Sequence, residues 1–395
     1  SSLYPKTSRG QGLQRKCYET FMRSKRPLAR LYGLGTALPP HAASQGDIQT
    51  FMSRVLQASG GDKASSGAPF LERLYASSGI KKRHSVLPDY SAESPEDFTF
   101  FPKNWALEPF PSTARRMESF EVWSVDLAER AARAALKRTG FAPAEVTHLV
   151  LTTCTGFFAP GPDLALVERL GLRPDVQRSL LGFMGCYAGF SAMRLAGDIV
   201  AADPGAVVLA LSVELCTLHF QKRPTPEFQV ANSLFADGAG AAVFAAPQAR
   251  PGGLGDLALC RGSLAPGSRD QMSWRIGDTG FEMSLDRRVP RTIERYAPAF
   301  VSDLLARAGL SRAEASRWAP HPGGKGIVTA LTECLRLEEG QTESALGVLG
   351  DCGNMSSATI FFVLEREFAR GGGPLVALGF GPGLTMEGAV FVPPR

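Results

Sequence analysis

The sequence GFAPAE at residues 140–145 returns in a looser form as GLSRAE at residues 309–314, in the second half of the chain. A short apolar run follows each copy and ends in a residue with reactive chemistry. In the first half the run is VLTTC, ending at Cys154, and in the second half it is WAPH, ending at His321. The two halves therefore read as copies of one α/β unit.

A second pair of matching segments follows in both halves. Cys186 lies in GCYAG, downstream of Cys154, and Asn354 lies in GNMSS, downstream of His321, and the two intervals are nearly equal. Each segment has a glycine, then a polar residue, then small residues that predict a helix. Cys, His and Asn, the residue types of a thiol-based acyl-transfer site, thus occupy equivalent places in the two copies.

The repeat continues into two pairs of apolar segments. PGAVVLAL at 204–211 matches GPLVALGF at 373–380, and GAAVF at 240–244 resembles GAVF at 388–391. Each is short, apolar and bounded by Gly or Pro, which is typical of a buried strand. Two such halves predict a layered α/β fold with helices between and outside two sheets. The alternative is chance similarity between Ala-, Gly- and Val-rich segments, but the common order of the matches favours duplication.

The composition indicates an ordinary globular protein. Hydrophobic residues make up 44% of the 395 residues and charged residues 21%, and no run approaches the ~18 apolar residues of a membrane helix. The start of the chain shows no charged-then-apolar signal peptide. Seven cysteines without close pairs suit free thiols in a reducing compartment. We therefore expect a cytoplasmic protein without a membrane span. The five His and seven Cys show no close ligand spacing, so we expect no metal site.

The net charge of +5 is concentrated at the N-terminus. Residues 1–30 hold eight Lys or Arg and one acid, Glu19, so the remainder is close to neutral. Nucleic-acid binding would need a basic face with stacking aromatics or a recognisable module, and the sequence has neither. The arm can be read as a solvated terminus, as a docking segment for an acidic partner such as an acyl carrier protein, or as an organelle transit peptide.

These patterns divide the chain into three parts. Residues 1–29 form the basic N-terminal arm. Residues 30–249 form the half that carries Cys186, and residues 250–395 form the half that carries His321 and Asn354.

Cys186 is the candidate nucleophile. It stands between an apolar run and a predicted helix, with glycine on both sides, so we expect a tight elbow that places sulfur at a helix N-terminus. The helix dipole and free N–H groups there favour thiolate over thiol. A buried structural cysteine is the alternative.

His321 and Asn354 are the candidate partners of that thiol. Pro320 and Pro322 flank His321, so its backbone is stiff and non-helical, and a rigidly held imidazole can pair with a thiolate. A neutral amide such as Asn354 can donate a hydrogen bond to a developing oxyanion but cannot perform acid–base work. A plain helix N-cap is the alternative for Asn354.

Five motifs, in order, resemble those of the type III polyketide synthases, the chalcone-synthase-like branch of the thiolase superfamily. They are TCTG at 153–156, GCYAG at 185–189, WAPHPGG at 318–324, GNMSS at 353–357 and GFGPG at 379–383. The resemblance covers about residues 30–395 and implies a thiolase-like αβαβα fold from two pseudo-duplicated halves. The HPGG and GFGPG motifs distinguish this branch from the ketoacyl-carrier-protein synthases, which share with it only the Cys, His and Asn residue types of the site.

The resemblance implies a mechanism. Cys186 would take an acyl starter from coenzyme A, and His321 and Asn354 would hold the thioester carbonyl of malonyl-CoA during decarboxylation. The resulting enolate would extend the chain by two carbons, and cyclisation would release a pyrone or an aromatic ring. No metal or bound redox cofactor is implied, and the substrates are coenzyme A thioesters.

The resemblance also implies cavity residues. Phe235 matches a gatekeeper phenylalanine between the coenzyme A tunnel and the cavity, and Met283 stands at a second gatekeeper position where an aromatic is usual in the plant enzymes. Further substrate-binding positions are Cys154, Glu214, Cys216, His219, Ser356, Gly379, Phe380, Gly381, Pro382 and Gly383. Small or flexible side chains at several of these positions favour an aliphatic or fatty acyl starter and an alkylpyrone or alkylresorcinol product.

The coenzyme A entrance is expected to be basic. Arg73 matches one of the family's basic residues near the tunnel mouth, whereas Phe70 and Ser77 replace two others. Lys81 and Lys82 follow closely and could supply charge, or they could belong to a solvated basic turn.

The resemblance further implies a homodimer, with the small Ala159 at the position that crosses the interface. Two rival functions stay open on the sequence alone: a ketoacyl-carrier-protein synthase III that makes one condensation, and a non-catalytic scaffold that retains the fold.

Overall fold

The computed structural model describes residues 27–60 and 62–394. Nearly all of the basic arm expected at residues 1–29 lies outside these described residues, so its role, including docking of an acyl carrier protein, stays a prediction.

The first half of the chain builds five strands of a mixed sheet. Their order is β5-β4-β6-β7-β1, with β4 parallel to β5 and β6, and β7 antiparallel to β6 and β1. These strands are β1 (Ala29–Ala37), β4 (His148–Thr153), β5 (Gln177–Gly182), β6 (Val207–Leu215) and β7 (Asp237–Ala245). β6 and β7 are buried along their whole length, as their apolar sequences predict for strands covered on both faces.

The second half repeats that pattern with four strands in the order β11-β12-β13-β8. β11 is parallel to β12, and β13 is antiparallel to both β12 and β8. These strands are β8 (Gly255–Leu264), β11 (Arg317–Pro320), β12 (Leu375–Gly381) and β13 (Thr385–Val392). The series β4, β6, β7, β1 thus matches β11, β12, β13, β8 in order and direction.

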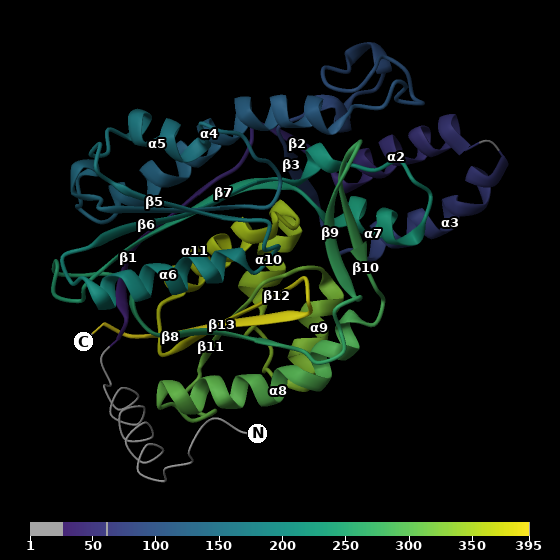
Figure 1. Ribbon diagram of the computed structural model, residues 1–395. Coiled ribbons are helices and arrows are strands. Elements are labelled where there is room, and N and C mark those ends of the chain that lie inside the picture. The colour runs from purple at the N-terminus through teal and green to yellow at the C-terminus, as the bar shows by residue number, and fades with distance from the viewer. Residues whose placement is uncertain (1–26, 61, 395) are drawn as a thin grey trace, which may run out of the picture.

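A short antiparallel pairing of β1 with β8 joins the two groups of strands into one nine-stranded hydrogen-bonded sheet. It consists of three residue pairs, Ala29 with Leu257, Arg30 with Asp256 and Leu31 with Gly255. The buried Arg30 guanidinium also binds the Asp256 carboxylate at 2.6 Å. Away from this corner the two groups diverge into separate layers (Figure 1).

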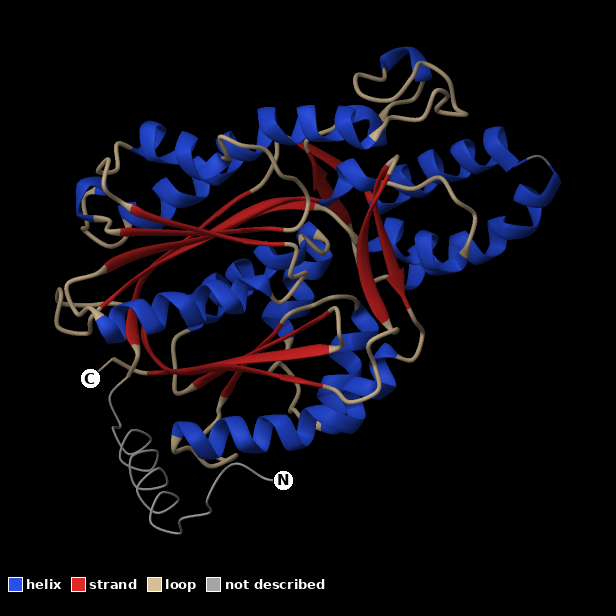
Figure 2. Cartoon of the chain, viewed as in Figure 1, coloured by secondary structure: helices blue, strands red, loops and turns tan. Residues whose placement is uncertain are grey.

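Helices fill the space between these layers and cover both outer faces, which gives five layers in all (Figures 1 and 2). The middle layer holds α6 (Ala188–Ala202) and α11 (Thr359–Arg370). One outer layer holds α4 (Thr113–Lys137) and α5 (Pro162–Leu170), and the other holds α8 (Val289–Ala308) and α9 (Lys325–Cys334). The predicted αβαβα fold is confirmed.

The position of each helix follows from its sequence. α4 is apolar along one face only, with Phe120, Ala128, Ala131 and Ala135 buried and charged residues opposite, as suits an outer helix. α6 and α11 begin with six consecutive buried residues, at 188–193 and 359–364, as suits helices between two sheets.

The remaining elements form a cap beside the sheet ends. They are β2 (His41–Ser44), α2 (Gln45–Gly60), α3 (Asp62–Ser77), β3 (Lys82–Ser85), α7 (Pro226–Leu234), β9 (Met272–Gly277), β10 (Gly280–Leu285) and α10 (Glu343–Cys352). Short 3₁₀ turns are η1 (Pro88–Ser91), η2 (Pro95–Asp97), η3 (Pro143–Glu145), η4 (Cys216–His219) and η5 (Ser356–Ala358). In residues 27–60 and 62–394, no helix has the length and apolar character required to cross a bilayer.

Candidate active site

Cys186 lies in the elbow between the end of β5 and the start of α6. The elbow depends on Gly185, whose φ of 92° is a conformation that side chains rarely adopt. A Cβ at Gly185 would also lie 2.4 Å from Cδ of Pro382. The sharp turn before Cys186 therefore requires a glycine at this position.

Burial controls the protonation of Cys186. The residue is 6% exposed, and desolvation raises the pKa of its thiol to about 11. Hydrogen bonding from the side chains of Ser356 and Asn354 opposes that shift. The sequence predicted a thiolate stabilised by a helix N-terminus. However, α6 begins two residues later at Ala188, and burial, the largest influence on the thiol pKa, favours the neutral thiol.

His321 directly follows β11, and its backbone N–H donates to the carbonyl of Leu378 at 2.7 Å. The residue is 1% exposed, and burial lowers its pKa to about 4, so the imidazole is neutral. Neither Nδ1 nor Nε2 has a hydrogen-bond partner among the residues that the structure describes. Buried polar atoms are nearly always paired, so this ring is fitted to bind something other than the protein.

Asn354 connects the other parts of the site. Its side-chain Nδ2 donates to the carbonyl of Gly323, two residues after His321, at 3.1 Å, and its Oδ1 accepts from the Ser356 N–H at 2.9 Å. Its side chain also approaches the Cys186 thiol closely enough to affect the thiol pKa. The amide thus lies between the loop that carries His321 and the nucleophile.

A small cavity of about 10 Å³ opens at the Cys186 thiol, close to the volume that one water molecule requires. It is lined by Cys154, Thr155, Gly185, Cys186, Cys216, Phe235, Trp274, Met283 and Ser356. Of the predicted substrate-binding residues, the structure therefore brings five to the nucleophile, namely Cys154, Cys216, Phe235, Met283 and Ser356.

Glu214 was expected on the cavity wall but lies behind it. Its carboxylate accepts hydrogen bonds from the Cys154 N–H at 2.9 Å, from the Thr155 hydroxyl at 2.8 Å and from the Ser357 hydroxyl. Burial raises its pKa to about 7. Glu214 thus ties the Cys154 strand end to η5, the turn that follows Asn354.

His219 also lies behind the cavity. Its Nε2 donates to the Thr155 carbonyl at 2.6 Å, and its Nδ1 accepts from the Phe281 N–H at 3.0 Å. Its ring stacks on that of Phe281 with centroids 4.1 Å apart, and burial lowers its pKa to about 3. Both nitrogens are used, so this histidine supports the wall and has no free atom for a substrate.

The GFGPG segment, from Gly379 and Phe380 through Gly381 to Pro382 and Gly383, supports the elbow and does not line the cavity. A Cβ at Gly381 would lie 2.6 Å from the Tyr187 ring and 3.5 Å from the Cys186 backbone nitrogen. These small residues let β12 approach the turn that holds the nucleophile.

Trp274 is a cavity residue that the sequence did not reveal. It lies on β9, its indole N–H donates to the Cys154 carbonyl at 2.7 Å, and its ring meets Phe281 edge-on. Trp274 pairs with Met283 across the β9–β10 hairpin, and the sequence could indicate this neighbour only through recognition of the two-residue turn between the strands.

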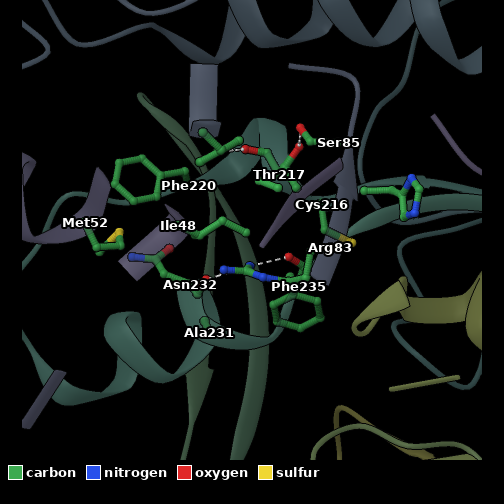
Figure 3. A pocket seen from close by; sticks show the side chains of 13 residues that line it. Ile48, Met52, Arg83, Ser85, Cys216, Thr217, Phe220, Ala231, Asn232 and Phe235 are labelled. Carbon is green, nitrogen blue, oxygen red and sulfur yellow. Dashed lines mark hydrogen bonds between the residues drawn. The ribbon is translucent and has the colours of Figure 1, made fainter. Parts of the chain in front are cut away.

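A second, larger space of about 40 Å³ lies beyond Cys216 and Phe235, which line both spaces. Figure 3 shows these two side chains at the edge of this chamber, with Ile48, Met52, Phe220 and Ala231 among its other walls. Some polar atoms at its margin are paired, as in the Ser85–Thr217 hydroxyl contact at 2.7 Å, whereas Nη2 of Arg83 has no hydrogen-bond partner among the described residues. The chamber is therefore a mainly apolar continuation of the site.

A wide cleft of about 700 Å³ lies beside the loop that follows His321. Gly323 and Gly324 of this loop are among its lining residues. Its cations are Lys325 and Arg287, with Glu227 and Asp286 also in the wall.

The three basic residues expected at the coenzyme A entrance are not in that wall. Arg73 is exposed on α3 beside the lining positions Phe70, Leu74 and Ser77. Lys81 and Lys82 are exposed at the start of β3. The cations that line the cleft come from the N-terminus of α8 and from the residue after HPGG.

No group of three or more His, Cys, Asp or Glu side chains within the described ranges is arranged to hold a metal ion. The six described cysteines are free thiols.

Comparison with known proteins matches nearly the whole chain to two family models. Residues 19–247 match the N-terminal domain of chalcone and stilbene synthases, and residues 256–393 match the C-terminal domain.

Individual proteins agree with these matches. The chain is 32% identical over 358 residues to 1,3,6,8-tetrahydroxynaphthalene synthase from Streptomyces peucetius subsp. caesius, covering 89% of this chain and 90% of that protein. It is 30% identical over 373 residues to the alpha-pyrone synthesis polyketide synthase-like Pks18 from Mycobacterium tuberculosis, covering 92% and 91%. The crystal structure of PKS-I from the brown alga Ectocarpus siliculosus superposes with a TM-score of 0.87 at 28% identity, covering 94% of this chain and 100% of that one.

Proposed function

The chain belongs to the chalcone and stilbene synthase family, the type III polyketide synthases, and from this premise we propose that it extends a Cys186-bound fatty acyl starter with malonyl-CoA and cyclises the product. Type III polyketide synthases are acyltransferases, so the chain is an enzyme of the transferase class. The starter and the pyrone or resorcinol product are the proposed parts.

The first step loads the nucleophile. Because thiol and imidazole are both neutral, His321 accepts the proton of Cys186 as sulfur attacks the thioester carbonyl of the acyl-CoA. Collapse of the tetrahedral intermediate expels the coenzyme A thiolate, which takes up a proton, and leaves the acyl group on Cys186.

The second step generates and uses the carbon nucleophile. Malonyl-CoA loses carbon dioxide, and its thioester oxygen becomes an enolate oxygen that receives hydrogen bonds from His321 and Asn354. The enolate carbon attacks the acyl thioester, and the Cys186 thiolate leaves. The electrons come from the broken carbon–carbon bond, so the proposed reaction needs neither a metal nor a redox cofactor.

The observation that carries this proposal is the buried, unpartnered His321 ring. Nδ1 and Nε2 of His321 have no hydrogen-bond partner among the described residues, and burying unpaired polar atoms lowers the free energy of unfolding. A ligand that forms a hydrogen bond with the ring offsets that cost. A thioester carbonyl supplies the acceptor, and the adjacent Asn354 amide supplies a second donor for the same oxygen.

We place the coenzyme A moiety in the cleft of about 700 Å³, because Gly323 and Gly324 line that cleft next to His321. Lys325 and Arg287 supply positive charge for the phosphates. Arg73, on the adjacent face of α3, could extend that charge, whereas Lys81 and Lys82 lie farther along the chain from the lining residues.

We place the acyl chain in the chamber beyond Cys216 and Phe235. The walls Ile48, Met52 and Phe220 are apolar, and each buried methylene contributes about 0.8 kcal/mol. The flexible Met52 can adjust to chain length. A fatty acyl group on Cys186 would enter this space past Cys216.

We also propose that the enzyme is a cytosolic homodimer, as the family resemblance implies. β5 ends the sheet, and its outer edge has no strand partner among the described residues. Leu180 on that edge is 44% exposed, as suits an apolar edge that a second copy covers. Ala159 is exposed nearby in the loop after Cys154.

The test is product analysis by mass spectrometry with malonyl-CoA and a ladder of acyl-CoA starters. Activity should rise with starter length and fall once the chamber is full. Cys216→Phe should move the optimum to shorter chains while short starters keep most of their rate. Cys154→Phe fills the small cavity at the nucleophile and not the chamber, so it should lower the rate with starters of every length instead of moving the optimum. An unchanged length profile in Cys216→Phe would contradict the fatty acyl assignment.

The same experiment separates the rival functions. Products with two or more extensions identify a polyketide synthase, whereas a single ketoacyl product would indicate the ketoacyl-carrier-protein synthase III reaction. Failure of Cys186 to become acylated would indicate the non-catalytic scaffold.

A further inference from the structure

Arg83 on β3 is a buried cation without a carboxylate partner in the described part of the chain. It is 5% exposed, and desolvation lowers its pKa. Its Nε donates to Oε1 of Gln45 at 3.0 Å, and its Nη1 donates to the carbonyls of Asn232 at 2.8 Å and Phe235 at 2.6 Å. Burying a charge is costly, so the carbonyls that it binds must matter to the structure.

Those carbonyls belong to the C-terminus of α7, the helix that ends next to Phe235 (Figure 3). A helix leaves its last carbonyls without partners, and a cation there also complements the helix dipole. Here Arg83 satisfies Asn232 and Phe235, and Gln45 Nε2 satisfies Ser233 at 2.8 Å. The side chains of Arg83 and Gln45, themselves hydrogen-bonded to each other, thus fix the end of the helix where the gatekeeper sits.

Asn354 satisfies the remaining carbonyl and is thereby joined to the same unit. Its backbone N–H donates to the Leu234 carbonyl at 2.9 Å, and its own carbonyl accepts from the Ala236 N–H at 2.9 Å. The stem of Arg83 packs beneath Gly353, where an added Cβ would lie 2.8 Å from Cγ of Arg83. Any displacement of the α7 end therefore displaces Asn354.

We propose that Arg83 is a positioning residue that holds the gatekeeper Phe235 and the decarboxylating amide of Asn354 as one rigid unit. This rests on the proposed role of Asn354 in malonyl-CoA decarboxylation. Arg83 acts on no reacting atom itself. It acts by fixing the backbone on which both side chains stand.

The test uses Arg83→Lys, which keeps the charge but loses the planar fork that binds Gln45 and two carbonyls together. Starter-independent decarboxylation of malonyl-CoA should fall about 10- to 100-fold in kcat, with a smaller change in KM, as for a catalytic group displaced by about 1 Å. The rate of Cys186 alkylation should change much less than the rate of decarboxylation, because Asn354 is only one of the groups that lower the thiol pKa and Ser356 lowers it more.

Arg116→Lys is the matched control. Arg116 is equally buried, lacks a carboxylate partner among the described residues, and binds the carbonyls of Leu218 and Phe220. It contacts neither Phe235 nor Asn354 through any of these bonds. Its variant should lose a similar amount of thermal stability but keep its decarboxylation rate. Equal losses of decarboxylation in both lysine variants would overturn the proposal, because a general loss of stability would explain them.

A double-mutant cycle with Asn354→Ala separates the proposal from its premise. If Arg83 acts through Asn354, Arg83→Lys should slow decarboxylation little further in the Asn354→Ala enzyme. A full additional loss would overturn the positioning role alone. An unchanged rate in Asn354→Ala itself would overturn the proposed role of the amide and the positioning role with it. Should Arg83→Lys not fold, Gln45→Met, which removes the second part of the clamp, must give the same non-additivity.

Discussion

The two halves of the molecule reach their catalytic residues by different routes. In the first half, α5 and then β5 lie between Cys154 and Cys186, and the elbow continues directly from a strand of the sheet. In the second half, two helices, α9 and α10, separate His321 from Asn354, and the described chain between them contains no strand. The backbone of Asn354 instead forms an isolated bridge to Phe235 of the first half. The strand and helix that flank the nucleophile therefore both belong to its own half, with Pro382 of the second half packed against the elbow, whereas the amide is joined to the other half by backbone hydrogen bonds.

The largest expected effect comes from the half that carries the nucleophile. Cys186→Ala should abolish condensation and leave the fold intact, because Cys186 is the proposed nucleophile and alanine fits the buried elbow. Steady-state turnover measures the loss of condensation, and thermal unfolding measures whether the fold is intact. Peptide mapping after thiol alkylation should find label at Cys186 ahead of the other cysteines, and full activity in the variant would refute its role.

Removing the second-half donors should separate two chemical steps. His321→Ala and Asn354→Ala should each slow malonyl-CoA decarboxylation about 100- to 1,000-fold, as the loss of one oxyanion donor does. Starter loading, followed by mass spectrometry of the acyl-enzyme, should depend much more on His321, since only the imidazole accepts the Cys186 proton. Loading and decarboxylation at the parent rate in both variants would show that neither residue has its proposed role.

The glycines before the two catalytic residues provide a matched pair. Gly185 and Gly353 both have positive φ, 92° and 74°. Alanine at either position incurs backbone strain of about 1–2 kcal/mol and a further cost from overlap. Gly185→Ala should reduce mainly the alkylation rate of Cys186, whereas Gly353→Ala should reduce mainly decarboxylation. The same kinetic defect in both variants would mean that the halves do not position their residues independently.

At neutral pH, the smallest expected effect is that of protonation on the stability of the fold. It grows towards acid pH for His321 and towards alkaline pH for Cys186. Burial lowers the His321 pKa from 6.5 to about 4, so the unfolded chain binds more protons in that interval and stability falls as pH drops from 6.5 towards 4. Burial raises the Cys186 pKa from 9.0 to about 11, so stability falls as pH rises from 9 towards 11. Each loss reaches the order of 3 kcal/mol at the far end of its interval, on the order of 1.4 kcal/mol for each pH unit.

Chemical unfolding across pH measures both effects. In His321→Gln, the free energy of unfolding should fall less steeply below pH 6.5 than in the parent enzyme. In Cys186→Ala, it should fall less steeply above pH 9. A change on the alkaline side in His321→Gln, or on the acid side in Cys186→Ala, would contradict the residue assigned to that pH range.

The sequence predicted what depends on local pattern and repetition. Buried strands appear as short apolar runs, and the duplicated order of motifs implied both sheets and the places of Cys186, His321 and Asn354. The interval that ends at Cys186 and the one that ends at Asn354 are nearly equal in length. Nothing in the sequence therefore indicated that the first contains a strand and the second a further helix.

Roles that depend on distant contacts could not be predicted in the same way. The family resemblance placed Glu214 and His219 on the cavity wall, but their polar atoms bind Ser357, Thr155 and Phe281. The entrance cations arise from separate segments that meet only in the folded chain. Arg83 directly follows the basic pair Lys81 and Lys82, but its burial depends on a helix end far along the sequence, at Phe235.

The pairing of β1 with β7 has a consequence for synthesis of the protein. Arg30 pairs with Ala245 and Ala37 with Ala239, so the partners lie at opposite ends of the first half. At ribosomal rates of about 5–20 residues per second, the apolar β1 emerges roughly 10–40 s before its partner exists. Until then its backbone and side chains lack the neighbours that cover them, a condition that promotes aggregation. Recombinant yield should therefore rise when translation is accelerated through residues 37–245 or when chaperones that bind extended apolar segments are co-produced.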